Sequence, residues 1–354
     1  MKRMDRYIGN TVLASILLAW LVVSVLEALF IFMGELGDVG RGGYTLADAA
    51  LFVLLTLPGR AYQSFPMAAL IGSLLGLGNL MVQSELNTFR LAGCSPARIT
   101  RSVIQAGLAM LLAVVAMGEG WAPLTQQMAR QLRATAIFND VSVQRDAGFW
   151  VRDGRRFIQV ARSGADGSLH GLVIYTPGDG SRLLSVGSAA QASYVDGQWQ
   201  LDDIRTTLFS GQAVRIESEA HRVSAHLVDP RLARLLTRDA QTLTLPELGS
   251  YIEYLKRNGS NVTGYRLRYW QRLATPLAVL AMLLLAVGLV LGPLSRQGIG
   301  QRILVGVVAG LVFKLVNETS LHAGLVYGIA PWASALLPSL LVSAGGLWLL
   351  RSRR

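Results

Sequence analysis

Long apolar blocks separated by short polar segments dominate this sequence. Residues 11–32 are apolar apart from Glu27, and a helix needs about 20 such residues to cross the hydrocarbon of a bilayer. The other blocks of comparable length are 65–82, 102–122, 273–291, 303–325 and 331–350. The pattern therefore predicts six transmembrane helices, three in each half of the chain.

Two other segments carry weaker helical patterns. Residues 46–58 are apolar but too short to cross a bilayer, so we expect a separate interfacial helix at the outer surface. Residues 123–137 are amphipathic and place Arg130 and Arg133 on a helix that continues beyond the membrane.

The middle of the chain has a different period. From residue 139 to about residue 240, apolar and polar residues alternate in short runs, as where Val214 and Ile216 alternate with Arg215 and Glu217. Turn signals such as Asp196-Gly197 separate the runs. This pattern is typical of an all-β sandwich or jelly roll, and a helical pattern returns at residues 245–257.

Together these patterns predict the fold class and its domains. We expect an α-helical integral membrane protein with six transmembrane helices and an inserted all-β jelly-roll domain. Residues 1–138 would hold the first three transmembrane helices. Residues 139–262 would hold the β domain and, at its C-terminal end, a helical linker. Residues 263–354 would hold the last three transmembrane helices.

Basic residues flank the apolar blocks and predict their orientation. The chain is 52% hydrophobic and 16% charged, too apolar for a typical soluble protein, and its net charge is +11. Lysine and arginine occur at both termini and in the loops 83–101 and 292–302, whereas residues 322–330 contain neither. The positive-inside rule thus places both termini in the cytoplasm, and the β domain outside, which in a bacterium is the periplasm.

The sequence lacks the motifs of common catalytic and metal sites. The single cysteine, Cys94, excludes an internal disulfide, and the four histidines lack metal-ligand spacing. No nucleotide-binding loop, H-E-x-x-H or G-x-S-x-G motif occurs, and the basic residues are not interleaved with aromatic ones as in nucleic-acid binding. We therefore expect a non-enzymatic chain without a cofactor, whose energy comes from a gradient or from nucleotide hydrolysis by a partner.

A short polar segment, residues 84–95, lies between two apolar blocks. Ser84 is a favourable N-cap, Glu85 falls in the first helical turn, and Gly93 can end the helix. Leu86 and Phe89 share one side of this short helix. The segment predicts a helix that docks on a cytoplasmic partner, although its shape alone fits a solvated loop equally well.

Short motifs spread over nearly the whole chain carry a family resemblance. They are Asp5-Arg6-Tyr7-Ile8-Gly9, Phe65-Pro66-Met67-Ala68-Ala69-Leu70, Gly76-Leu77-Gly78, Ser84-Glu85-Leu86, Ala92-Gly93, Gly120-Trp121-Ala122-Pro123, Gln127-Met128-Ala129-Arg130, Gly292-Pro293-Leu294, Tyr327-Gly328-Ile329 and Leu337-Pro338. Together they resemble the LptF/LptG family, the permeases of the lipopolysaccharide-export ABC transporter. The first of these motifs and the Gly292 motif are most similar to the LptG branch.

The resemblance implies a complex in the inner membrane of a Gram-negative bacterium. An LptF-like and an LptG-like permease would pair with two copies of a cytoplasmic ATPase, LptB, which would bind ATP and magnesium. LptC and the periplasmic bridge protein LptA would receive lipopolysaccharide from a cavity between the permeases, along apolar grooves of β jelly rolls. This chain would be a non-catalytic subunit.

The resemblance also implies roles for particular residues. A coupling helix seated on the ATPase would comprise Ser84, Glu85, Leu86, Phe89, Arg90 and Gly93. Contacts to lipopolysaccharide would come from Arg130, Arg133 and the inward-alternating Ile174, Leu201 and Ile216 of the β domain. Snorkelling to phospholipid headgroups is the open alternative for the two arginines. Family members often carry lysines at the outer end of the first span, where this chain has Ile31, Gly37 and Asp38.

Lys314 and Glu318 are charged residues inside the fifth predicted span. They lie four residues apart, hence about one turn from each other on a helix. An ammonium at this depth is costly, so Lys314 should meet Glu318, Glu27 or water. Two interpretations stay open, namely a structural ion pair or a contact from Lys314 to a lipid A phosphate.

Two functions from other classes also fit the architecture. A mechanotransmitting or signalling membrane protein would use the β domain as a sensor. A secondary transporter is the other alternative, but the paired broken helices or internal repeats typical of that class are not evident in the sequence.

Overall fold

The computed structural model divides the chain into two compact units. It describes residues 3–138, 149–153, 155–164, 168–178, 182–195, 197–210, 213–224, 227, 243–257, 261–295 and 297–351. The helical unit comprises Met1–Val39, Ala49–Ala129 and Thr263–Arg354. The second unit, which contains the β strands, comprises Gly40–Asp48 and Arg130–Val262.

Long helices account for the apolar blocks. The helical elements of the first half of the chain are α1 (Arg3–Glu35), η1 (Leu36–Asp38), α2 (Leu46–Val82), α3 (Glu85–Leu91), α4 (Pro96–Ala116), the π-helical turn η2 (Met117–Trp121) and α5 (Ala122–Phe138). Those that form the last part of the chain are α9 (Thr263–Leu291), α10 (Ile299–Tyr327) and α11 (Pro331–Arg351). Among the described residues, six helices are long and apolar enough to cross a membrane, which confirms the predicted number.

The prediction of a separate interfacial helix at residues 46–58 is wrong. That segment is the first part of α2, which runs without a break through Pro58 and Pro66 to Val82. Proline is tolerated in membrane helices because neighbouring groups satisfy the backbone carbonyls that it leaves free. At 1.5 Å per residue α2 is about 55 Å long, which exceeds the hydrocarbon thickness of a bilayer.

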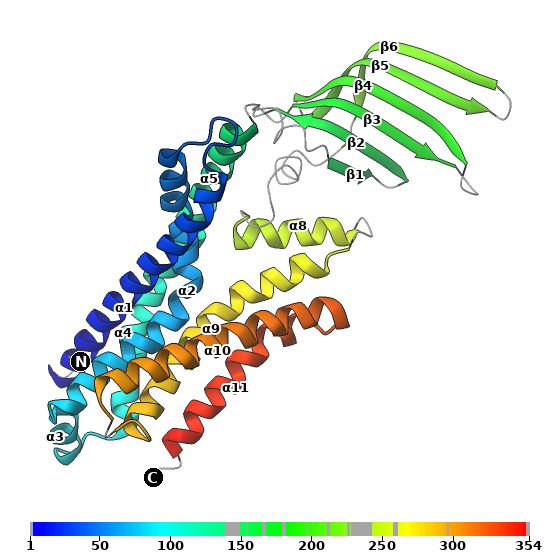
Figure 1. The fold of residues 1–354 in the computed structure, drawn as a ribbon. Helices are drawn as coiled ribbons and strands as arrows, with labels where there is room; N and C mark the ends of the chain where they lie inside the picture. Colours follow the sequence, from blue (N-terminus) through cyan, green and yellow to red (C-terminus); the bar gives the residue numbers. More distant parts are fainter. Residues whose placement is uncertain are drawn as a thin grey trace. The chain divides into compact units, whose positions relative to one another are not determined.

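Glycines bring the helices of the first unit close together. A Cβ added to Gly72 of α2 would lie 2.3 Å from the Cα of Ile16 in α1, so the two backbones are in direct contact. Gly107 of α4 likewise lies against Leu283 of α9. The helices α9 and α11, both visible in Figure 1, pack against each other, and Gly346 of α11 lies against the backbone of Leu285 in α9. Ala68, Gly72 and Gly76 of α2 are spaced four residues apart, a pattern of small residues that membrane helices commonly use for packing.

The second unit contains one antiparallel sheet whose strands follow the order of the chain (Figure 1). The strands are β1 (Phe149–Asp153), β2 (Arg156–Ser163), β3 (Leu169–Pro177), β4 (Leu183–Val195), β5 (Gln198–Ser210) and β6 (Ala213–Ser224). The helix α8 (Leu245–Arg257) belongs to the same unit, and Thr244 and Glu247 form a capping box at its start, with Thr244 N donating to Glu247 Oε2 at 2.8 Å.

The inserted all-β domain is confirmed, and its described strands form one antiparallel sheet. A sandwich or jelly roll has two sheets with Greek-key crossings, whereas the strands of the described residues form a single meander. The predicted β segments within 139–148 and 225–240 lie outside the described residues, except for Leu227.

A kink across the sheet lets residues three apart share its core. The β3–β4 register passes from the His170–Gln191 pair to the Leu172–Ala189 pair, and the intervening Gly171 has a φ of 65°. Asp203 of β5 has a φ of 51° at the corresponding step. These left-handed residues reverse the alternation of side chains. The core consists of Val151, Ile158, Val160, Leu169, Leu172, Ala189, Ala192, Trp199, Leu201, Ile204 and Leu227.

Candidate functional site

In the second half of the segment between α2 and α4, the chain folds as its local sequence predicts. The helix α3 ends before Gly93, whose φ is 89°, and Cys94 N donates to Phe89 O at 2.9 Å in a Schellman-type closure. Ser95 then caps α4, because its Oγ accepts from Arg98 N, and Pro96 is the first helical residue. Cys94 itself is buried in the helical core.

The start of α3 differs from the prediction. Ser84 O accepts from Thr88 N, as the carbonyl of an N-cap does, but Ser84 has a φ of 57° and not the extended backbone of an ordinary N-cap. Ser84 N donates to Met81 O at 3.0 Å, so the end of α2 and the start of α3 meet in a left-handed turn at this one residue.

The side chains of α3 divide between the protein interior and the exterior. Leu86 is completely buried and Phe89 packs at the edge of the helical core. Leu91, at the end of the helix, is 89% exposed. The side chain of Arg90, which the sequence placed in this site, lies outside the described residues.

Glu85 is partly engaged within its own chain. Its Oε1 accepts a hydrogen bond from the Tyr7 hydroxyl of α1 at 3.2 Å, and the Tyr7 ring meets Phe89 edge-on with centroids 6.4 Å apart. The other oxygen, Oε2, is buried and has no hydrogen-bond partner in the described part of the chain. The first turns of α1 therefore hold α3 from one side.

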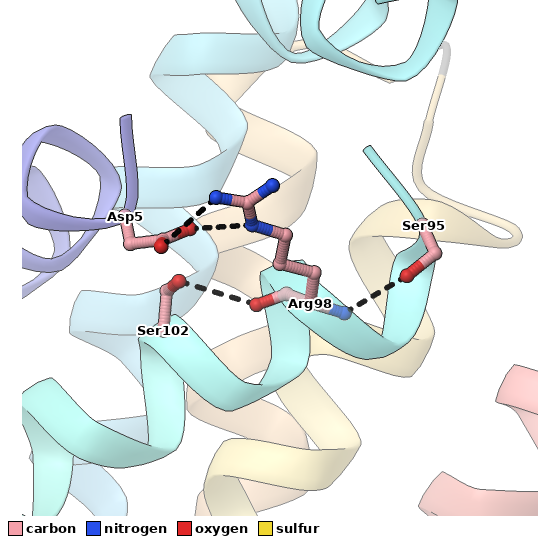
Figure 2. A network of polar contacts seen from close by, with 4 residues as sticks. All are labelled: Asp5, Ser95, Arg98 and Ser102. Atoms are coloured by element: carbon pink, nitrogen blue, oxygen red, sulfur yellow. Dashed lines mark hydrogen bonds and ion pairs between the residues drawn. The ribbon is translucent and has the colours of Figure 1, made fainter. Parts of the chain in front are cut away.

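A second contact fixes the start of α1 to the start of α4 (Figure 2). Arg98 Nε lies 2.8 Å from Asp5 Oδ1, and Arg98 Nη2 lies 3.1 Å from Asp5 Oδ2. Ser102 Oγ donates to Arg98 O one turn further along α4. Sequence reasoning missed this bidentate pair, although opposite charges in two predicted cytoplasmic segments were a usable signal.

Arg302 of α10 is a buried cation that the sequence did not single out. The guanidinium donates to the backbone oxygens of Gly78 at 2.5 Å, Leu294 at 3.3 Å and Ser295 at 3.5 Å. A positive charge in a predicted cytoplasmic loop usually stays in water, so only the tertiary fold distinguishes Arg302 from its neighbours.

The two charged residues predicted inside the fifth span, Lys314 and Glu318, do not pair with each other in the described structure. Lys314 and Glu318 are both exposed, and no ion pair joins them within the described helices. The Glu27 carboxylate of α1 lies within electrostatic range of Lys314 and of Arg60 in α2. Which of the three predicted partners Lys314 meets stays a prediction, and the electrostatic interaction with Glu27 is compatible with one of them.

Arg130 and Arg133 lie on the part of α5 that belongs to the second unit. Both side chains are half-buried, and each already interacts with another group of the chain. Their role in lipid binding stays a prediction.

The three predicted lipid-facing residues of the β domain do not share one face. Leu201 is 2% exposed and Ile174 packs against the same core, whereas Ile216 is 69% exposed. The register aligns Ile174 with Gly187, Thr206 and Glu217, so Ile216 points to the opposite face. Arg215, which alternates with Ile216 along β6, is thus on the face of Ile174.

Apolar side chains gather on the face that carries Ile216. Trp150 stacks on Tyr175 with ring centroids 5.6 Å apart. The exposed members of this face, aligned by the register, are Trp150, Phe157, Leu184, Phe209, Val214 and Ile216. The sheet therefore presents apolar surface on the side away from its core. No cluster of metal-ligating side chains occurs in the part of the chain that the structure describes.

Six apolar helices with an inserted antiparallel sheet define a multi-spanning membrane protein. Residues 6–352 match the family model described as lipopolysaccharide export system permease LptF/LptG. The chain is similar to the lipopolysaccharide export system permease protein LptG of Escherichia coli strain K12, at 32% identity over 98% of this chain and 97% of that protein. It is equally similar, at 32% identity, to LptG of Haemophilus influenzae over 99% of both chains. The chain belongs to the LptF/LptG family of lipopolysaccharide export permeases, as the motifs predicted.

Proposed function

We propose that this chain is the LptG-type permease subunit of an ATP-driven transporter that extracts lipopolysaccharide from the inner membrane. It pairs with an LptF-type permease, and two copies of an LptB-type ATPase supply the energy in the cytoplasm. Lipopolysaccharide then passes to LptC- and LptA-type proteins in the periplasm. ATP and magnesium bind to the ATPase, and this chain carries out no hydrolysis.

The observation that carries the proposal is the construction of α3. A seven-residue helix is too short to be stable alone, yet α3 is anchored by buried Leu86 and by the contacts of Tyr7 with Glu85 and Phe89. Its last residue, Leu91, projects a large apolar side chain to the exterior. A rigidly held short helix with an exposed apolar residue suits docking into a groove of a partner.

The charge distribution supports the orientation in this proposal. Both termini, α3 and the α9–α10 turn are on the cytoplasmic side, because the basic residues cluster there. The sheet is then periplasmic, where its exposed apolar face offers a surface for acyl chains. In this proposal, the positive charges of Arg130 and Arg133 attract the phosphates of lipid A.

The test is co-purification and coupled transport. The full chain, co-expressed with an LptF-type permease and an LptB-type ATPase, should form a stable complex whose ATP hydrolysis rises when lipopolysaccharide is present. Glu85→Lys should weaken assembly or uncouple hydrolysis from release, because losing one partner of a desolvated interfacial charge costs about 2–5 kcal/mol. Ser250→Lys on the exposed side of α8, a helix without an assigned role in coupling, is the control and should transport normally.

A sensor is the alternative function, and the same complex decides between the two. A sensor would bind a periplasmic ligand without moving lipopolysaccharide to an acceptor. Full transport by Glu85→Lys would contradict the coupling role of α3, whereas assembly without any lipopolysaccharide release by the wild-type complex would contradict the transport function.

A further inference from the structure

One row of residues on α10 packs closely against α2. A Cβ added to Gly306 would lie 2.8 Å from Leu74 Cδ1, and one added to Gly310 would lie 2.7 Å from Met67 Cγ. The two glycines are four residues apart, so they belong to one ridge of the helix. Side chains of α2 fill the space that the glycines leave, and the two helices are fitted to each other over this length.

Arg302 continues this row by one turn toward the cytoplasmic end of α10. Its side chain is 1% exposed, and it reaches across to α2 at Gly78 O and back to the α9–α10 turn at Leu294 O and Ser295 O. One guanidinium thus joins three segments, namely α2, the turn and α10. A planar group with donors on three nitrogens is the side chain best suited to such a junction.

The surface of α2 is shaped for this guanidinium. A Cβ at Gly78 would lie 2.6 Å from Arg302 Nη1 and 2.8 Å from Arg302 Cδ, so a side chain there would displace the arginine. Among the described residues, the hydrogen-bond partners of Arg302 are all backbone carbonyls. A buried cation without a carboxylate is costly, which favours a geometric role over a simple stabilising one.

The position of the junction connects two parts of the candidate site. Gly78 lies one turn before the end of α2, and the next helix along the chain is α3. In the other direction, Lys314 continues the same row of α10, about 18 Å from Arg302 at 1.5 Å per residue. A displacement of α3 therefore has a short and well-packed route along α2 and α10 as far as Gly310, one turn before the exposed Lys314.

We propose that Arg302 is a positioning residue that fastens α10 to α2, so that the two helices move as one body when α3 is displaced. The inference rests on the proposed function, because it assigns the route by which the ATPase acts on the membrane helices. A merely structural arginine would affect yield and thermal stability, but not the amount of lipopolysaccharide released per ATP.

The experiment measures that ratio in a vesicle-reconstituted complex of the full chain with its partner permease and ATPase. Arg302→Lys keeps the charge, but one ammonium cannot span three carbonyls. Gly78→Ala disturbs the same junction from α2 without changing any charge. Both variants should release between about 5-fold and 150-fold less lipopolysaccharide per ATP, the range of typical coupling between sites. Arg101→Lys, at an exposed arginine of α4, is the control and should match the wild type.

An unchanged ratio in both variants would overturn the inference. If neither variant assembles, a distance measured in a chain that keeps Arg302 and Gly78 still tests the inference. Spin labels at Asn79 of α2 and Leu304 of α10, both exposed, should keep their separation within about 1–2 Å between nucleotide-free and ATP-bound states, in a Cys94→Ala background. A larger change would also overturn it. Absence of lipopolysaccharide-stimulated hydrolysis in the wild-type complex would contradict the proposed function itself, while the label distance would still decide whether α2 and α10 move together.

Discussion

The helices α2 and α10 are equally apolar but lie in opposite environments. The most apolar 18-residue stretches of the two helices have mean hydropathies of 1.7 and 1.8. In α2, 78% of that stretch is buried inside the chain, whereas in α10 only 22% of it is buried. Hydropathy therefore shows that a segment can cross a membrane, but it does not show what the segment faces. The helix α2 is the scaffold of its unit, whereas α10 leaves most of its surface for lipid or a partner.

Small residues explain part of this difference. In α2, Gly72 and Gly76 face α1, and Gly78 faces Arg302, so glycines occur on more than one side of the helix. In α10, Gly306 and Gly310 face α2 and Gly324 faces Ser334 of α11, whereas many other positions carry large exposed apolar side chains. The distribution of glycines around a helix thus indicates how many neighbours it has, because close approach needs the absence of a side chain.

The largest expected effect comes from filling the closest contact of α2. Gly72→Leu would place carbon atoms on the Ile16 backbone, which cannot move aside as a flexible side chain can. We expect a loss of about 3 kcal/mol or more and little folded protein in detergent. Gly345→Leu in α11, where nothing lies within 4 Å of the added Cβ, is the matched control and should be purified at wild-type yield. Equal yields of the two variants would show that the α1–α2 contact is not as close as described.

A truncation compares the two helices directly. Leu70 of α2 is fully buried and Leu304 of α10 is 64% exposed. Leu70→Ala should lower the free energy of unfolding by about 2 kcal/mol or more, because it leaves a cavity in the core. Leu304→Ala should change it by about 0.5 kcal/mol or less in the isolated chain. Denaturant titration in mixed micelles measures both, and a similar cost at the two sites would contradict the contrast in burial.

Sequence reasoning was most successful where local chemistry decides the structure. The left-handed Gly93 that follows α3 and the helix α8 at residues 245–257 both depend on residues within about one turn. It failed at α2, where Pro58 and the polar residues after it indicated a break. Tertiary packing carries that helix through, since Gly59 and Tyr62 are buried against neighbours.

Contacts between distant segments were beyond sequence reasoning. The pairing of Asp5 with Arg98, and of Arg302 with three carbonyls, depends on which helix ends lie together. In the sheet, period-2 alternation located the strands, but Asp203 and Gly171 reverse the alternation part-way along them. That reversal is why Leu201 and Ile216, which the pattern placed on one face, have such different exposure.

The smallest expected effect concerns the charges that α10 brings into the membrane region. Lys314 is exposed on α10 and interacts electrostatically with Glu27 of α1. A double-mutant cycle with Lys314→Met and Glu27→Gln should give a coupling energy of about 1 kcal/mol or less, as for other partly solvated pairs. The cycle with Glu318→Gln in place of Glu27→Gln is the control, and it should give no coupling because no ion pair joins Lys314 and Glu318. Both cycles are read from thermal unfolding of the isolated chain, so that a lipid A contact does not contribute. Coupling to Glu318 but not to Glu27 would mean that Lys314 interacts with a carboxylate of its own helix. The expected electrostatic interaction between α10 and α1 would then be contradicted.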